Sequence, residues 1–389
     1  MIQPAQRMQR LAASIFTNMA EKKAEKLSSL EDIIDLSIGS PDLPPPDGVR
    51  NLFSEESLKE DQYGYSLKGT QEFNKAVVTY YKERFQIKLN ENEVLQLMGS
   101  QDGLAHLALA YLDAGDILIA PDPGYPVYSA CTSLAGAELY SLPVNEENHF
   151  MPDLDKIPIE IAKKAKIFIM NYPGNPTAAM VTQEYFEKAV SFALEHNILI
   201  VHDFAYSELV FTDQKPLSIF HIPDARKTAI EFNSLSKSFN MAGARIGYAV
   251  GFPSYLKPLA DIKSNIDYGV FYPLQKAAAY ALTKEYKFLD DHRSIYKKRR
   301  DVFCEKLHEY GWNVTIPDGG MFIWARVPGH YSSLSFALTA LDYGVVVTPG
   351  NAFGSGGEGY VRIALTKDTD TLIEAAKRLG SLIKEERGK

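Results

Sequence analysis

The sequence predicts an α/β protein whose main part is a mostly parallel, seven-stranded sheet with helices on both faces, accompanied by a smaller α+β domain. Between about residues 94 and 250, seven short apolar runs alternate with stretches of helical character, a pattern typical of parallel strands buried on both faces. After residue 285 this alternation stops and a long charged stretch follows. At 389 residues, the chain is long enough for a large core and a second domain.

The predicted strands of the large sheet follow one another at short intervals. They are residues 94–98, 117–120, 138–142, 166–170, 198–201, 228–232 and 246–250. Only about a dozen residues separate the last two runs, and a parallel crossover with its helix usually needs that many or more. We therefore predict one antiparallel strand in this sheet.

The remaining chain predicts the second domain. A charged helix over residues 287–310 leads into strands at 321–327 and 345–347, and a final helix begins near Thr369. Residues 37–48, dense in proline and glycine, break any regular element and are expected to pass between the domains. The predicted domains are therefore residues 46–284 for the large one, and residues 1–45 with 285–389 for the small one.

Composition narrows the classes of partner and compartment. The formal charge of −8 gives no reason to expect nucleic acid or a membrane surface. Two distant cysteines, Cys131 and Cys304, fit a reducing, cytoplasmic setting and buried packing roles, without a zinc site. No apolar stretch is long enough to span a membrane. The basic first twenty residues resemble a transit peptide, but their apolar residues form one helical stripe, which favours a packing helix.

Polar clusters follow five of the predicted strands, each directly after the strand ends. They are Ser100-Gln101, Asp122 to Tyr125, Asn171 to Asn175, Asp203 to Tyr206, and Ser234 to Lys237. In open α/β sheets, ligands bind in the crevice at the carboxyl ends of the strands. We therefore expect these clusters to meet at one cleft.

In the last cluster, Lys237 lies between Ser236 and Ser238. Ser234 lies three residues before the lysine, and Arg245 lies eight residues after it. A lysine that forms a Schiff base must lie where its pKa is lowered, so that the neutral amine can attack. Serines and an arginine beside it suit a phosphate group. The alternative is a solvated lysine in a structural turn.

Asp203 ends an apolar strand, where an ionised carboxylate is costly to bury without a cationic partner. That partner is a neighbouring arginine or a helix terminus in the simple interpretation, and a pyridinium nitrogen in the functional one. Tyr206, three residues on, can place its hydroxyl near the same ring. The alternative for Tyr206 is that it is simply one of 22 tyrosines.

Three loops at other strand ends also have two interpretations. Asn175 lies in a turn stiffened by two prolines, and either bonds its own backbone or faces the cleft. Ser100 and Gln101 open a predicted helix whose N-terminus can bind phosphate. Tyr125 is either a core residue or a ring that stacks on a flat cofactor.

Arg362 lies in a predicted apolar strand of the second domain. An arginine in such a strand commonly forms a salt bridge across the sheet. The functional alternative is a bidentate clamp for a substrate carboxylate.

In combination, these segments resemble the class I/II aminotransferases, which are fold-type I pyridoxal-phosphate enzymes. The resemblance covers nearly the whole chain, and its most specific part is the ordered set of DPGYP, NYPGNPT, HDFAY, SLSKSFNMAGARIG and YVRIAL. It implies a cytoplasmic homodimer that moves an amino group between an L-amino acid and a 2-oxo acid, with 2-oxoglutarate as the expected acceptor.

The resemblance also implies a role for each residue. Lys237 is similar to the Schiff-base lysine, and Asp203 to the partner of the pyridine nitrogen. The resemblance implies that Tyr206 and Asn175 contact the ring's phenolic oxygen, that Tyr125 stacks on the ring, and that the phosphate is surrounded by Ser100, Gln101, Ser234, Ser236 and Arg245. It also implies that Arg362 is the clamp for the substrate α-carboxylate, with Gly39 and Asn175 lining that site. Tyr65 or Tyr63 is implied to reach the phosphate of the other subunit. With these groups, Asp203 keeps the ring protonated and Lys237 carries the proton.

Some positions depart from the commonest family pattern. Ala178 stands where glycine is usual, and Ala244, where tryptophan is frequent, is expected to reshape the pocket. No arginine lies between Arg245 and Arg293 to bind an acidic side chain, although lysines such as Lys263 offer a substitute. Segments 202–209, 234–251 and 263–271 resemble most closely the LL-diaminopimelate aminotransferases and their neighbours that act on methionine, alanine or aromatic amino acids.

The resemblance leaves two other activities open. The same site can catalyse β-elimination from a sulfur amino acid, because that reaction labilises the same proton. A non-catalytic regulator is the third alternative, but the acidic charge disfavours DNA, and Lys237, Asp203 and Arg362 are all present.

Overall fold

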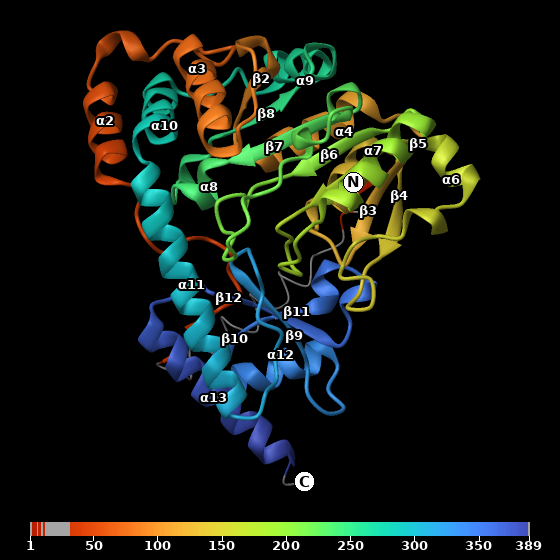
Figure 1. Ribbon diagram of the computed structural model, residues 1–389, viewed down its shortest axis with the longest axis vertical. Coiled ribbons are helices and arrows are strands. Elements are labelled where there is room, and N and C mark those ends of the chain that lie inside the picture. Colours follow the sequence, from red (N-terminus) through yellow and green to blue (C-terminus); the bar gives the residue numbers. More distant parts are fainter. Residues whose placement is uncertain (1, 6, 9–10, 12–31, 388–389) are drawn as a thin grey trace.

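The computed structural model describes residues 2–5, 7–8, 11 and 32–387. It consists of a large α/β domain and a smaller α+β domain, and the long helix α11 (Tyr286–Glu309) runs from one to the other (Figure 1). The packing helix predicted for the first twenty residues lies mostly outside the described residues. No described helix is long and apolar enough to cross a membrane.

The large domain contains the predicted seven-stranded sheet in the order β2-β8-β7-β6-β5-β3-β4. The strands are β2 (Val94–Leu97), β3 (Ile117–Asp122), β4 (Glu138–Pro143), β5 (Ala165–Asn171), β6 (Leu199–Asp203), β7 (Ala229–Ser234) and β8 (Gly247–Gly251). Strand β8 pairs antiparallel with both β7 and β2, while the other pairs are parallel. The prediction of a single antiparallel strand is confirmed.

Helices cover both faces of this sheet because alternate strand residues point to opposite sides. In β3, Ile117 and Ile119 pack into one hydrophobic cluster, and Leu118 and Ala120 into the other. The first cluster includes helices α3, α7 and α10, and the second includes α4, α5 and α9. The helices of the large domain are α2 (Asp47–Ser57), α3 (Gln71–Tyr80), α4 (Ser100–Tyr111), α5 (Val127–Ala135), α6 (Ile159–Lys164), α7 (Gln183–His196), α8 (Leu235–Ser238), α9 (Pro253–Ile266) and α10 (Tyr272–Lys284).

Local signals fix the ends of these helices. Helix α7 begins where the Thr182 side chain accepts a hydrogen bond from the Tyr185 amide, and it ends where Asn197 adopts a left-handed conformation. Residues 36–46 contain no helix or strand, as their prolines predict. Asp47 and Gly48, which we expected in that irregular segment, instead begin α2, because the preceding prolines do not restrict residues that follow them.

The small domain has a separate hydrophobic cluster, which its helices and strands form together with α11 and with Ala205, Tyr206, Leu209 and Phe211 of the large domain. Its elements are β1 (Ile34–Asp35), β9 (Phe322–Arg326), α12 (Ser333–Asp342), β10 (Val345–Val346), β11 (Thr348–Pro349), β12 (Tyr360–Ala364) and α13 (Thr369–Arg387). Strands β11, β12 and β9 form an antiparallel sheet, and β1 pairs in parallel with β10. This pairing brings residues 34–35 into the same domain as the C-terminal part of the chain.

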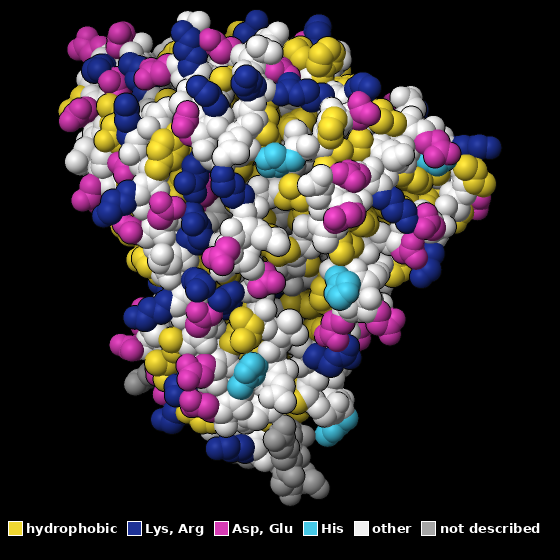
Figure 2. All heavy atoms as spheres, in the orientation of Figure 1, with side chains coloured by type: hydrophobic (Ala, Val, Ile, Leu, Met, Phe, Trp, Pro, Cys, Tyr) yellow, Lys and Arg dark blue, Asp and Glu magenta, His cyan; other side chains and the backbone are white. Residues whose placement is uncertain are grey.

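The expectation for the two cysteines is confirmed in the structure. Cys131 and Cys304 are both buried free thiols. On the face drawn in Figure 2, Lys and Arg side chains are interspersed with Asp and Glu, and no patch of a single sign dominates.

Candidate active site

A cavity of about 660 Å³ lies where the two domains meet. The large domain contributes residues that follow its strands, and the small domain contributes residues from β9, β12 and the segment after β1. The predicted residues that line it are Gly39, Ser100, Gln101, Tyr125, Asn175, Asp203, Tyr206, Ser234, Ser236, Lys237, Arg245 and Arg362. The structure therefore brings together every predicted site residue except Tyr65 and its alternative Tyr63.

Parallel strand order explains this convergence. Strands β3, β5, β6 and β7 run in the same direction, so their carboxyl ends meet at one edge of the sheet. The cleft predicted from the polar clusters lies at that edge.

Lys237 lies in the single helical turn α8, which begins where Ser234 Oγ accepts a hydrogen bond from the Ser236 amide. Its Nζ donates to the Gly39 carbonyl oxygen at 2.5 Å. Burial, together with the charges of Arg362 and Arg245, lowers the pKa of the Lys237 amine to about 8. The alternative of a solvated surface lysine is wrong, and a neutral amine is accessible near neutral pH.

Asp203 is buried at the end of β6. Its Oδ2 accepts a hydrogen bond from Tyr128 Oη at 3.0 Å, while Oδ1 has no hydrogen-bond partner among the described residues. Burial raises the pKa of this carboxyl group. Asp203 forms no ion pair with any described arginine, so the arginine partner of the simple interpretation is not found. One buried oxygen remains available to a donor in the cavity.

Asn175 and Arg362 contact each other across the domain boundary. Arg362 Nη1 donates to Asn175 Oδ1 at 2.9 Å, and Nη2 donates to the Ser37 carbonyl oxygen at 2.6 Å. In the described part of the chain, Arg362 has no carboxylate partner, and its Nε is buried without an acceptor. The predicted alternatives, a cross-sheet salt bridge for Arg362 and a self-bonded turn for Asn175, are therefore both wrong.

The arginine is also held between aromatic rings. Its guanidinium carbon lies 4.3 Å from the ring centroid of Phe322 and 4.7 Å from that of Phe353. Burial lowers the pKa of Arg362 to about 10. A desolvated, oriented guanidinium of this kind binds a carboxylate strongly.

Donors for an anion gather at the start of α4. The helix begins at Ser100, directly after Gly99, whose φ is +85°. A Cβ at Gly99 would lie only 2.7 Å from Arg245 Nη2, so glycine allows this guanidinium to approach the helix N-terminus. The helix dipole, the arginine and the hydroxyls of Ser234 and Ser236 form a site suited to phosphate.

Two tyrosines complete the cavity wall, and a third was missed. Tyr125 donates from Oη to Gln101 Oε1 at 3.1 Å, and Tyr206 packs edge-on against Phe322. Tyr128, one helical turn after Tyr125, bonds to Asp203 and was not predicted. In the sequence, Tyr128 is marked only by its position three residues after Tyr125, at the start of a helix. That spacing does not show which strand the side chain contacts.

Tyr63 and Tyr65 lie outside this cavity, with 67% and 83% of their surface exposed. The Tyr63 hydroxyl donates to the Ser57 carbonyl oxygen. The Tyr65 ring packs against Tyr268, and its hydroxyl forms no hydrogen bond with any described residue. Of the two tyrosines, Tyr65 is therefore the one whose hydroxyl is more available.

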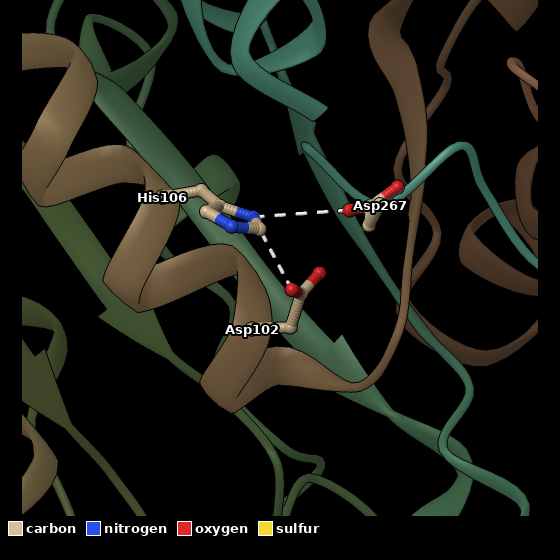
Figure 3. Close-up of side chains that lie close together, drawn as sticks. All are labelled: Asp102, His106 and Asp267. Atoms are coloured by element: carbon tan, nitrogen blue, oxygen red, sulfur yellow. Dashed lines mark ion pairs between the residues drawn. The ribbon is translucent and has the colours of Figure 1, made fainter. Parts of the chain in front are cut away.

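Lys263, the predicted substitute for a second substrate-binding arginine, is buried in an ionic cluster next to α4. Its Nζ lies 3.1 Å from Asp102 Oδ2 and 2.6 Å from Asp267 Oδ2. Figure 3 shows these two carboxylates flanking His106, which is one helical turn after Asp102. Since Lys263 is held by two aspartates of the same chain, this position argues against a role in binding an acidic substrate.

The two departures from the family pattern have different consequences. Ala178 adopts a left-handed backbone with φ of +55°, the conformation for which glycine is favoured. Ala244 packs against the hydrophobic core, whereas Ala242 lines the cavity. The expectation that Ala244 reshapes the pocket is therefore not supported.

Comparison with known proteins places the chain in a family. The family model for aminotransferase class I and II matches residues 31–379. The LL-diaminopimelate aminotransferase from Aquifex aeolicus is 42% identical, and the match covers 98% of this chain and 100% of that protein. The one from Maridesulfovibrio salexigens is 43% identical, and the match covers 97% of this chain and 98% of that protein.

Solved structures show the same relationship. Substrate-bound BacF from Bacillus subtilis is 35% identical with a TM-score of 0.95, covering 98% of both chains. A probable N-succinyldiaminopimelate aminotransferase from Thermus thermophilus is 34% identical with a TM-score of 0.90, covering 95% of this chain and all of its own. The chain belongs to the class I and II aminotransferases, pyridoxal-phosphate-dependent enzymes that move an amino group between an amino acid and a 2-oxo acid.

Proposed function

We propose that this aminotransferase binds pyridoxal phosphate in the cavity between its domains, through Lys237, and takes LL-diaminopimelate as amino donor and 2-oxoglutarate as acceptor. The observation that carries the site is that Lys237 and Asp203 line the same cavity. The first is a partly buried amine with a lowered pKa, and the second is a buried carboxylate with one oxygen that has no partner among the described residues. The donor is supported by the similarity to LL-diaminopimelate aminotransferases that are 41% to 43% identical to this chain.

The residues present fit this cofactor at each of its polar groups. Asp203 Oδ1 is a buried acceptor without a partner, as a protonated pyridine nitrogen requires. Asn175 and Tyr206 line the cavity beside Asp203 and supply an amide and a hydroxyl to the phenolic oxygen. Tyr125 supplies an aromatic face for the ring.

The phosphate group would be held at the start of α4. Its ligands are the donors described above, Ser100, Gln101, Ser234, Ser236 and Arg245. We further propose that the enzyme is a cytoplasmic homodimer in which Tyr65 of one subunit reaches the phosphate held by the other. The exposed ring of Tyr65 and its unpaired hydroxyl support this choice over Tyr63.

Lys237 has two roles in this proposal. As a neutral amine it forms the covalent bond to the cofactor, and after the donor displaces it the amine moves the proton from the substrate α-carbon. The bound cofactor supplies the electron sink that makes this proton labile. Asp203 keeps the ring nitrogen protonated, because a buried carboxylate is most stable beside a positive charge.

Arg362 would orient the substrate by its α-carboxylate. Among the described residues Nε has no acceptor, and Nη1 and Nη2 each use one hydrogen on Asn175 and Ser37, so the remaining N–H groups can bind a carboxylate. Gly39 leaves room there, since a Cβ at this residue would lie 2.7 Å from Phe322 Cζ and displace the ring that packs on the guanidinium. The clamp therefore depends on both domains.

The donor is tested by a screen of amino acids with 2-oxoglutarate, measured as glutamate formed. The panel contains LL- and meso-diaminopimelate, methionine, alanine, phenylalanine and aspartate, and the Lys237→Ala enzyme serves as the blank. We expect the highest kcat/KM for LL-diaminopimelate. A higher value for another donor would overturn this substrate, and release of pyruvate and ammonia from a sulfur amino acid without acceptor would instead indicate a β-lyase.

The cofactor-free protein should capture pyridoxal phosphate faster as the pH rises through about 8, and the rate should level off above that value. Only the neutral amine attacks the aldehyde, and burial lowers the pKa of Lys237 to about 8. An exposed lysine, with a pKa of about 10.4, would show no plateau in this range. The rise of the cofactor's visible absorption band in a stopped-flow pH series measures this, and a midpoint near the ordinary lysine value would contradict the assignment.

Arg362→Lys should lower kcat/KM for amino donors by about tenfold to a hundredfold, mostly through KM. A lysine keeps the charge but cannot bind a carboxylate through two parallel hydrogen bonds. Steady-state kinetics measure the effect. The matched control is Arg326→Lys, an exposed arginine of the same sheet that pairs with Glu146. If both variants had the same KM, the clamp role would be wrong.

A further inference from the structure

We propose that His292 is a positioning residue for this reaction, which holds the main chain of Lys237 in place so that its amine swings about a fixed point. The inference rests on the proposed role of Lys237 and adds a residue that contacts neither the substrate nor the cavity. His292 lies on α11, 55 residues after the lysine.

The contact is a hydrogen bond from the imidazole to the lysine's own carbonyl group. His292 Nε2 lies 2.9 Å from the Lys237 carbonyl oxygen. Helix α8 has only four residues, and the last four carbonyl groups of any helix lack an intrahelical partner. The histidine therefore supplies a donor that so short a helix cannot supply to itself.

The ring is fixed in the donating form. His292 is 1% exposed, and burial is the main reason that its pKa falls to about 4. A neutral imidazole carries one N–H, and because a carbonyl oxygen only accepts, that hydrogen is on Nε2. Phe288 stacks on the ring at 5.4 Å and 13°, and Tyr296 meets it edge-on at 4.9 Å. At working pH the ring is therefore neutral, and the two aromatic contacts pack it against the Lys237 carbonyl oxygen.

The same helix also holds the group that faces the lysine's amine. Arg299, two turns after His292, binds both oxygens of Asp42 at 2.7 Å. Asp42 lies three residues after Gly39, whose carbonyl oxygen accepts from Lys237 Nζ. Helix α11, which runs between the domains (Figure 1), therefore anchors the backbone of Lys237 and the segment that its amine contacts.

A fixed backbone matters because Lys237 has to deliver a proton between two atoms with its flexible side chain. Small displacements of a reacting group lower the rate of the chemical step far more than they weaken substrate binding. A loss of the His292 contact should therefore appear in kcat and in the lysine's own reactivity, with little change in KM.

The test compares His292→Phe, which keeps a flat buried ring but removes the donor, with His292→Gln, whose side-chain amide can donate again. The matched control is His308→Phe. His308 lies on the same helix and makes the same kind of bond, from Nε2 to the Val314 carbonyl oxygen at 2.8 Å, inside the small domain. The thermal unfolding temperature of each holoenzyme is measured first, and all assays are run well below the lowest of these temperatures.

Two quantities are measured: kcat and KM for the best donor, and the rate at which the cofactor-free protein captures pyridoxal phosphate. We expect His292→Phe to lower kcat and the capture rate by on the order of tenfold at unchanged KM, His292→Gln to recover most of this loss, and His308→Phe to match the wild type. Wild-type rates in His292→Phe, or an equal loss in His308→Phe, would overturn this inference but would leave the proposed function standing. Absence of cofactor capture by the wild type would overturn the proposed function.

Discussion

Replacing Lys237 with alanine should remove the visible absorption of the lysine-bound cofactor and lower the transamination rate by on the order of 10⁴-fold, the upper end of the range for a positioned proton carrier. The variant loses the covalent anchor and the base in one step, because both roles belong to the same amine. The other groups of the cavity, including Asp203 and Arg362, are unchanged, so pyridoxal phosphate should still bind, although reversibly and without a bond to the protein.

The measurements for this variant are the absorption spectrum after dialysis and single-turnover kinetics with the best donor. The control is Lys166→Ala, an exposed lysine at the opposite end of β5 from the cavity. We expect a wild-type spectrum and rate for the control. A retained lysine-type spectrum in Lys237→Ala would show that another lysine forms the covalent bond and would refute the assignment.

Much of the fold could be predicted because the lengths of the connecting segments and the alternation of apolar runs with helical stretches restrict the topology. The dozen residues between β7 and β8 are at the lower limit for a parallel crossover with its helix, and β8 is antiparallel. The parallel strands then place their following loops at one edge, which is why Asn175, Asp203 and Lys237 share a cavity. These inferences use only local sequence and the direction of strands.

The remaining part of the site depends on contacts between distant segments. Tyr128 reaches Asp203 across 75 residues, and His292 reaches Lys237 across 55. In the sequence, His292 stands in a strongly charged helix, where a solvated side chain is the natural expectation. Its burial results from how α11 packs across both domains, and no local pattern contains that information.

Lys263 illustrates the same limit from the opposite direction. From the sequence it is a candidate for binding an acidic substrate, because no arginine lies between Arg245 and Arg293. In the structure it is paired with Asp102 and Asp267. A buried lysine already compensated by two carboxylates cannot serve a third without losing these pairs.

Asp203→Asn should lower kcat/KM by about 10²- to 10³-fold, the cost of removing one oriented electrostatic partner from a buried site. The amide has nearly the same shape and can still accept from Tyr128, but it cannot hold a positive charge on the ring nitrogen. Capture of the cofactor by Lys237 should continue, since the amine and the phosphate ligands are intact. Steady-state kinetics and the visible spectrum therefore separate Asp203 from Lys237. The control is Asp113→Asn, an exposed aspartate before β3 at the far end of the sheet.

The same substitution should stabilise the cofactor-free protein while it damages the enzyme. Burial raises the folded-state pKa of Asp203, so its charge opposes folding once the pH exceeds the ordinary aspartate value of about 3.9. The cost grows as the pH rises toward the raised folded value and stays constant above it. Asparagine removes this cost, and the unfolding temperature of cofactor-free Asp203→Asn should exceed that of the wild type at pH 7 but approach it in acid. With cofactor bound the advantage should shrink, because the ring nitrogen then compensates the wild-type charge. If the cofactor-free variant were less stable at pH 7, Asp203 would be a structural residue, and its unpartnered oxygen would not be evidence of a cofactor contact.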